Sequence, residues 1–439
     1  MKRINLIIIL LSSLCAAVAA QDTLSLKQCI ERGLERNYSI LIIRNEERVA
    51  ANNATAGNAG MLPALDMSSG FSGTNYDYRY NYTDGTTGAA NGVNTETLNV
   101  GLNFDWTLFD GFGIQANYAK LKELRRMGEL NTRMVIEDFV ADIASEYYNL
   151  IRQRIRLSNL RSAVVLSKER LRIVEERYYI GSGSRLELQQ AKVDFNADSS
   201  KLLTQFEVVH ASRTRLNELM GNSEIDLRFR LRDSLITPNP SLEETAIWDN
   251  TLLHNASLLA AQKNMTISEL DYKKTASRNY PYLKLNAGYG YQLGWNGTGT
   301  TELQKRLGLN YGLTLGFTLF DGLNRRREQR NARIQIQNSE LRIQQLELAL
   351  KTDHSNIWMA YRNNLELWQL EKENLVAAQE NHNIAIERYK LGDLSGIELR
   401  EAQNSLLEAE ERLSIAEYNI KLCEISLMQL SGQILEYFY

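Results

Sequence analysis

The chain has 439 residues, with 50 Lys and Arg against 53 Asp and Glu, a formal net charge of −3. This near balance gives no support for nucleic-acid binding. Only four prolines interrupt the sequence, and each lies at a boundary between predicted elements. We therefore expect few and long elements.

The first 20 residues have the order of a secretory signal peptide. Lys2 and Arg3 precede an apolar run at 7–14 and small residues at 16–20. The run is too short to span a bilayer as a helix, and no second long apolar run follows, so entry into a membrane requires strands. We predict a signal peptide at 1–20. Cys15 leaves lipidation open, although Leu14 before it is larger than a lipoprotein site prefers.

The first half of the mature chain, residues 21–221, is predicted to contain four elements in order. These are a helix at about 23–60, a β-hairpin at about 62–109, a long helix at 112–180 and a half-length helix at 184–221. Apolar residues at a seven-residue interval from Ile136 to Tyr178 indicate the long helix. Alternation from Leu98 to Leu108 indicates a strand. In the preceding strand the alternation changes parity, so we expect a bulge or a frayed end there, with a loop at 83–94.

A linker at 222–241, which contains Pro238 and Pro240, is predicted to form an equatorial region. The second half, residues 242–432, has a helix, a hairpin at about 281–320, a long helix at 322–390 and a half-length helix at 395–431. A tail at 433–439 follows. The half-length helices at 23–60 and 395–431 have similar lengths, so end to end they match one long helix.

Three motifs return at a single displacement of 211 residues, which indicates an internal two-fold repeat. Upstream of the hairpin the displacement is 218, so the length change lies within the hairpin. The pairs are Leu-Phe-Asp-Gly at 108–111 and 319–322, Arg-Tyr-x-x-Gly at 177–181 and 388–392, and Leu-x-Gly at 219–221 and 430–432.

The predicted strands have the pattern of membrane strands, with one face toward lipid and one toward water. Four strands cannot close a barrel, and an open sheet edge is not tolerated in lipid. Several chains must therefore contribute strands. An ordinary half-buried sheet is the alternative, but no other part of the sequence obviously supplies the partner surface it needs.

With these paired motifs and this order of elements, the chain resembles the TolC-type outer membrane efflux protein family over nearly all its mature length. The resemblance implies an α+β membrane protein in which a long α-helical barrel of coiled-coil helices continues into a transmembrane β-barrel. Each protomer supplies four strands, and a homotrimer closes the barrel. The location implied is the outer membrane of a Gram-negative bacterium, with most of the chain in the periplasm.

The resemblance also implies function. Members are passive exit ducts of tripartite efflux or type I secretion systems, and they catalyse no reaction. Their partners are a periplasmic adaptor (membrane fusion protein), an inner-membrane RND or ABC-type transporter, and outer membrane lipid. The alternative is a structural or adhesive coiled-coil stalk anchored in the outer membrane, for which a second membrane hairpin has no use.

The periplasmic entrance is assigned by position in the family pattern. Glu398 and Glu401, spaced i, i+3, match the acids that ring the family's entrance, and Tyr389 and Glu187 match residues that hold it shut. A solvated acidic helix surface is the simpler reading of the two glutamates. Leu394 occupies the position of the family's gating arginine, which leaves Arg185 or Arg400 as replacements.

The turns at Gly181 and Ser182 and at Gly392 and Asp393 match the family's docking surface for the adaptor. Glycine also suits a tight turn, and both interpretations hold together.

Cys29 and Cys423 are the two cysteines of the mature chain, and end-to-end stacking would bring them close enough for a disulfide. The other interpretation makes Cys423 one more small residue of a helical seam. The four histidines lie apart from any ligand pattern, and no nucleotide or nucleophile motif occurs, so we expect no metal, no cofactor and no enzyme.

Overall fold

The structure is a computed structural model that describes residues 23–297 and 301–438. The predicted signal peptide therefore lies outside the described residues. The chain forms two compact units. One contains residues up to 45, 130–259 and from 345 onward, and the other contains 46–129 and 260–344. Two long helices, α5 (Gly113–Tyr179) and α9 (Asn324–Leu391), contribute to both units.

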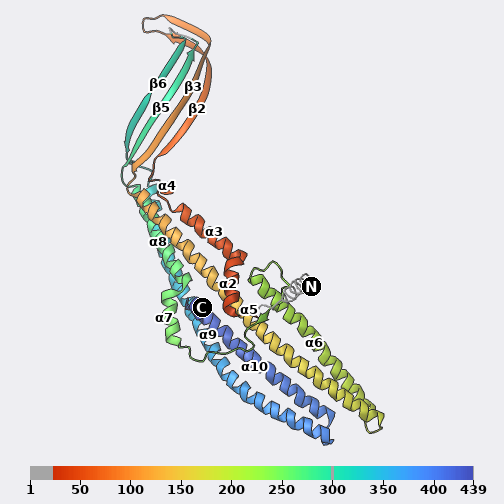
Figure 1. The fold of residues 1–439 in the computed structure, drawn as a ribbon. Coiled ribbons are helices and arrows are strands. Elements are labelled where there is room, and N and C mark those ends of the chain that lie inside the picture. Colours follow the sequence, from red (N-terminus) through yellow and green to blue (C-terminus); the bar gives the residue numbers. More distant parts are fainter. Residues whose placement is uncertain (1–22, 298–300, 439) are drawn as a thin grey trace, which may run out of the picture. The chain divides into compact units, whose positions relative to one another are not determined.

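The second unit contains one antiparallel sheet in the order β2-β3-β5-β6 (Figure 1). Its strands are β2 (Ala64–Asn81), β3 (Thr87–Phe109), β5 (Tyr282–Asn296) and β6 (Leu303–Gly316). The register shifts between Tyr76 and Tyr78, which confirms the bulge expected from the change in parity. The loop expected at 83–94 is wrong in extent, because β3 begins at Thr87 and pairs with the end of β2.

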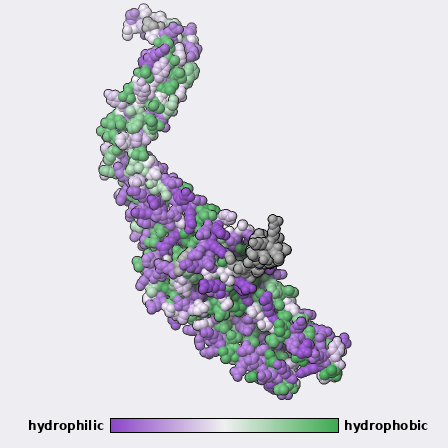
Figure 2. Space-filling model, in the orientation of Figure 1, coloured by the Kyte–Doolittle hydropathy of each residue, from purple (hydrophilic) through white to green (hydrophobic). Residues whose placement is uncertain are grey.

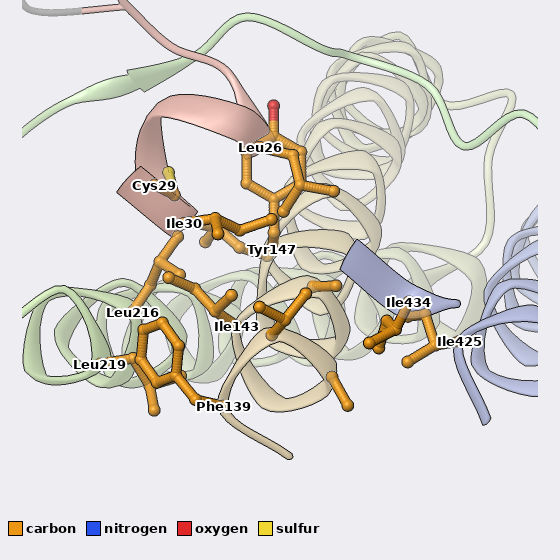
Figure 3. Packing of buried hydrophobic residues seen from close by; sticks show 14 of the residues in the cluster. Leu26, Cys29, Ile30, Phe139, Ile143, Tyr147, Leu216, Leu219, Ile425 and Ile434 are labelled. Carbon is orange, nitrogen blue, oxygen red and sulfur yellow. The ribbon is translucent and has the colours of Figure 1, made fainter. Parts of the chain in front are cut away.

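The helices of the first unit surround one hydrophobic core. Besides parts of α5 and α9, they are α2 (Leu26–Arg36), α6 (Arg185–Leu219), α7 (Glu244–His254), α10 (Gly396–Leu430) and α11 (Ile434–Phe438). This core includes Ile143 and Tyr147 of α5, Ile30 of α2, Leu216 of α6 and Ile434 of α11 (Figure 3). None of the helices within the described ranges combines the length and apolarity needed to cross a membrane.

The linker is held against the core by backbone pairing and by a buried ion pair. Strand β1 (Thr23–Leu24) pairs in parallel with β4 (Arg230–Leu231) in the linker. Farther along, the Asn239 backbone N–H donates to Glu424 of α10 at 2.6 Å. Glu424, fully buried, also accepts from Lys421 at 2.6 Å and from Tyr437 of α11 at 2.7 Å. A buried carboxylate needs such partners, so this cluster fixes the linker and the C-terminal helix together.

Asparagine breaks each helix that precedes a hairpin. The helix expected at 23–60 is three helices, α2, α3 (Tyr38–Asn53) and α4 (Ala56–Ala59), and in the second half α7 is followed by α8 (Ala256–Ser277). Asn37 separates α2 from α3, and its side-chain oxygen accepts from the Ser39 N–H at 2.9 Å. Asn255 separates α7 from α8 and accepts from the Leu258 N–H at 3.0 Å. Each asparagine therefore caps the helix that follows it.

The same two asparagines show which helices meet end to end. The Asn37 side-chain amide donates to the Leu219 carbonyl at the end of α6, at 3.0 Å. The Asn255 amide donates to the Leu430 carbonyl at the end of α10, also at 3.0 Å. The stacking expected between 23–60 and 395–431 is therefore wrong. Each half stacks its own pair of helices, α6 with α3 and α10 with α8, because the asparagine satisfies backbone groups of both ends at once.

Replacing Asn37 by Ala should lower the free energy of unfolding by about 1–2 kcal/mol, because it removes a helix cap and a bond to a second helix end. Asn255→Ala should have a similar effect. Thermal unfolding of the detergent-purified protein, followed by circular dichroism, measures the change. Asn52→Ala, at an exposed position of α3, is the control and should match the wild type. Unchanged midpoints in both asparagine variants would contradict the shared-cap interpretation.

Candidate functional site

Two helical hairpins, α5–α6 and α9–α10, end in equivalent turns. Gly181 and Gly392 have φ of 82° and 87°, values that side chains rarely adopt, so the turns require glycine. In the first turn the Ser182 N–H donates to the Arg177 carbonyl at 2.9 Å. In the second the Asp393 N–H donates to Arg388 at 3.0 Å. Gly181, Ser182, Gly392 and Asp393 are all exposed in the protomer.

The helices that follow these turns begin with capping boxes. Ser184 Oγ accepts from the Glu187 N–H at 3.1 Å, and Ser395 Oγ accepts from the Glu398 N–H at 3.3 Å. The Glu398 carboxylate accepts in return from the Ser395 N–H at 2.9 Å. The Ser395 hydroxyl also donates to this carboxylate, at 2.7 Å, and the two bonds from the hydroxyl and the N–H of Ser395 hold the pKa of the Glu398 carboxyl below its usual value. Glu187 and Glu398 therefore both complete a capping box at a helix start. The Ser-x-x-Glu spacing in the sequence predicts this role.

Three arginines connect the two hairpins. Arg400 of α10 forms two bonds, of 2.6 and 2.7 Å, to the carboxylate of Asp198 on α6. Arg170 of α5 pairs with Asp194 of α6 and also donates to the Gly396 carbonyl of α10 at 3.2 Å. The guanidinium of Arg177 lies 5.1 Å from the centre of the Tyr389 ring. Asp198 is only 1% exposed, so its bidentate pairing with Arg400 is essential to its burial.

A cavity of about 560 Å³ lies among these groups. Of the residues that the sequence assigns to the entrance, Tyr389 and Glu187 line it. Tyr389 is buried, and burial raises the pKa of its hydroxyl, so the phenol stays neutral. The turn residues Gly392 and Asp393 and the arginine candidate Arg400 also line the cavity.

Other predicted residues lie outside this cavity. Glu398 and Glu401 are exposed on α10, and Arg185 is exposed at the start of α6. Within the part of the chain that the structure describes, Arg185 has no ion-pair partner, so Arg400 is the candidate that is engaged. Sequence reasoning missed Arg170 and Asp194. Asp198 gives a signal in the sequence, because it interrupts the apolar seam of α6, the row of residues that begins with Leu188 and Ala191 and ends with Leu216 and Leu219.

The disulfide left open between Cys29 and Cys423 is not formed, because both cysteines are free thiols. The Asn37 amide at the end of α2 binds the end of α6, whereas the end of α10 is bound by Asn255. The nearest polar contact of Cys423 Sγ is the Asn364 side-chain amide of α9, at 4.0 Å. Cys29 is fully buried, and burial raises the pKa of its thiol to about 12, so it stays protonated at neutral pH.

Within the described ranges no group of three or more His, Cys, Asp or Glu side chains has an arrangement that could hold a metal ion. Together, the sheet of membrane-type strands, the long helical hairpins and their connected turns define the class of outer-membrane channel protomers. Each half has the same order of helices, two strands, a long helix and a half-length helix (Figure 1).

The comparisons with known proteins agree with this class. The model of the family described as outer membrane efflux protein matches residues 29–222 and 247–433, and the chain belongs to this family. The chain is similar to outer membrane protein TolC of Vibrio cholerae, with 19% identity over 97% of this chain and 94% of that protein.

Two solved structures have the same fold. One is a membrane protein from Pseudomonas aeruginosa, with a TM-score of 0.76, 14% identity, and 93% of both chains covered. The other is VceC from Vibrio cholerae, with a TM-score of 0.72, 18% identity, and 93% of this chain and 96% of that chain covered. The predictions of an outer-membrane location, of an efflux channel and of no enzymatic activity are confirmed by family membership.

Alkylation under denaturing conditions without reductant should add one label to Cys29 and one to Cys423, because both thiols are free. In the native protein Cys29 should react far more slowly, because it is buried and protonated. Peptide mass spectrometry measures both. A crosslinked peptide containing the two cysteines would contradict the structure.

Proposed function

We propose that three copies of the chain close a transmembrane β-barrel and form the exit duct of a tripartite efflux or secretion system. The main supporting observation is that the two outer strands of the sheet, β2 and β6, each have one edge without a partner strand. Their side chains form exposed apolar rows, with Met67 73% and Leu315 71% exposed. An open edge in lipid leaves backbone groups unsatisfied, and pairing β6 of one copy with β2 of the next removes both edges.

We also propose that the two halves, 21–221 and 242–432, are copies of one unit, joined by the equatorial linker at 222–241. The four exposed turn residues Gly181, Ser182, Gly392 and Asp393 are the proposed docking surface for a periplasmic adaptor. Ile180 and Leu391 next to them are 78% and 77% exposed, which gives a protein partner apolar surface to bury. An inner-membrane transporter would deliver substrate through that adaptor.

The entrance is proposed to be held shut by the contacts between hairpins, chiefly Arg400–Asp198 and Arg170–Gly396. Tyr389, packed under Arg177, and Glu187 line the same closed region. In the trimer Glu398 and Glu401 would form rings of carboxylates at the entrance. Such rings attract cations and repel anions. The hydrogen bonds from Ser395 lower the pKa of the Glu398 carboxyl and so favour its charged form in each protomer.

Glu398→Gln with Glu401→Gln should lower cation selectivity and relieve block by multivalent cations in planar-bilayer recordings. Glutamine can still complete the capping box at residue 398, so the substitution removes the charge and keeps the helix cap. Glu366→Gln with Glu380→Gln, both exposed on α9, is the matched control. Wild-type selectivity in the entrance variant would refute the carboxylate rings, and a trimer without conductance would favour the structural stalk.

Arg400→Gln should raise resting conductance strongly, because it leaves Asp198 buried without its cation, a change that typically costs about 3–5 kcal/mol. Asp198→Asn should act in the same direction but more weakly, since the amide oxygen still accepts a hydrogen bond. Single-channel recording gives the open probability. Arg412→Gln, which breaks the more exposed pair with Glu371, is the control and should remain closed. A correctly trimeric Arg400→Gln channel with wild-type conductance would contradict the proposal that the Arg400–Asp198 contact holds the entrance shut.

A further inference from the structure

A basic surface lies where α8 ends and α9 begins, within the sheet-containing unit. The two helix ends are tied together by contacts between their side chains and backbone. Arg333 donates to the Tyr272 hydroxyl at 2.9 Å, and Arg325 donates to the Arg278 carbonyl at 3.0 Å. We name this surface the arginine patch, and its basic residues are Lys273, Arg278, Arg325, Arg326, Arg327, Arg330 and Arg333.

Few acids neutralise the patch. Asp321 accepts from the Arg325 backbone at 3.0 Å and from its side chain at 3.1 Å. Glu328 pairs with Arg278 and lies 3.9 Å from Arg327. Among the residues described, the exposed Lys273, Arg326 and Arg330 have no carboxylate partner. The patch therefore carries excess positive charge toward solvent.

The fold does not need these arginines. The first half makes the same turn, in which the Asp110 carboxylate accepts from the Ile114 N–H at 3.0 Å. The residues after the two turn glycines, Phe112 and Leu323, have similar positive φ values of 69° and 64°. Yet α5 has Ile114, Gln115, Ala116 and Ala119 where α9 has Arg325, Arg326, Arg327 and Arg330.

The arginines are also unfavourable for the isolated chain. Exposed backbone N–H groups give the first turn of a helix a partial positive charge, and cations placed there are repelled by it and by one another. The first turn of α9 itself contains no acidic residue, and Asp321, which precedes it, offsets only part of this charge. An unfavourable charge cluster that the fold does not require indicates an external anion.

The neighbouring surface indicates which anion. Directly before the patch, Leu319 and Phe320 are 86% and 76% exposed, and Leu323 is 55% exposed. Figure 2 shows hydrophobic side chains over the strands near the strand–helix turns, next to hydrophilic side chains over the adjoining helices. An exposed apolar band bordered by cations is the surface that meets both the acyl chains and the phosphates of a lipid leaflet.

We propose that the arginine patch binds anionic phospholipid headgroups, such as phosphatidylglycerol, at the periplasmic leaflet of the outer membrane. This inference rests on the proposed membrane role of the sheet. The headgroup phosphate accepts from Arg326 and Arg330, while Leu319, Phe320 and Leu323 contact the acyl chains. Phosphate contacts of this kind suit the forked guanidinium.

The test variant is Arg326→Gln with Arg330→Ala, which installs the residues that the first half has at these positions. Arg342→Gln with Arg362→Ala removes the same charge farther along α9, at exposed positions, and is the control. Delipidated trimers in neutral detergent are titrated with phosphatidylglycerol or phosphatidylcholine. Native mass spectrometry measures bound lipid, and thermal unfolding measures stabilisation.

Wild type and control should bind phosphatidylglycerol in preference to phosphatidylcholine and unfold at higher temperature with it, less so at high salt. The test variant should bind it about 30-fold more weakly, since each basic residue near an anionic lipid surface contributes about 1 kcal/mol. Its stability in phosphatidylcholine should equal or slightly exceed that of the wild type, because the substitutions relieve charge repulsion at the start of α9.

Three results would overturn the proposal. The two lipids could act equally on the wild type, free inorganic phosphate could stabilise it as well as phosphatidylglycerol does, or the test variant could dissociate in every lipid. The last result would make the patch a contact between subunits. Planar-bilayer conductance of the same preparations separates this inference from the proposed function, because a conducting trimer indifferent to phosphatidylglycerol contradicts the patch alone.

Discussion

At the ends of a helix, backbone N–H and C=O groups have no partner within the helix. The way these groups obtain partners from other parts of the chain organises the structure. At the tips of the helical hairpins, serine and glutamate side chains satisfy the first N–H groups of α6 and α10. At the opposite ends of the same helices, Asn37 and Asn255 supply the missing donor to one helix and the missing acceptor to another. The four-stranded sheet keeps two open edges within the protomer, β2 and β6, and these edges are the basis for proposing further copies.

Periodicity in the sequence was sufficient to predict the long elements. A strict seven-residue repeat predicted a helix at 112–180, where α5 covers Gly113–Tyr179, because a single buried stripe repeats for as long as the helix has a neighbour. Alternation predicted the strands and the bulge near Tyr76. Propensity alone did not reveal the breaks at Asn37 and Asn255, because each break depends on a carbonyl some 180 residues away in sequence.

The site was less predictable than the fold for the same reason. Glu398 and Tyr389 came from their positions in the family pattern, but the arginine that engages a buried acid could not be chosen from spacing. Arg185 and Arg400 were equal candidates until the packing of α6 against α10 placed Asp198 opposite Arg400. Polar residues in the seam were the useful signal. Asp198, Gln205 and Ser212 each bond to a neighbouring helix, so each interruption of the apolar seam marks a contact between helices.

The two halves have the same order of helices and strands but differ in the charged residues at equivalent positions. Asp198 corresponds to Ala409 in the second half, and Arg400 corresponds to Gln189 in the first. Neither half contains both members of the pair at these positions, so two identical halves could not form this bond with each other. A buried carboxylate without its cation is strongly unfavourable, so Asp198 is tolerated only because the second half supplies Arg400. The two halves therefore differ in charge where they contact each other, and the covalent link keeps the acid of one half and the arginine of the other in one chain.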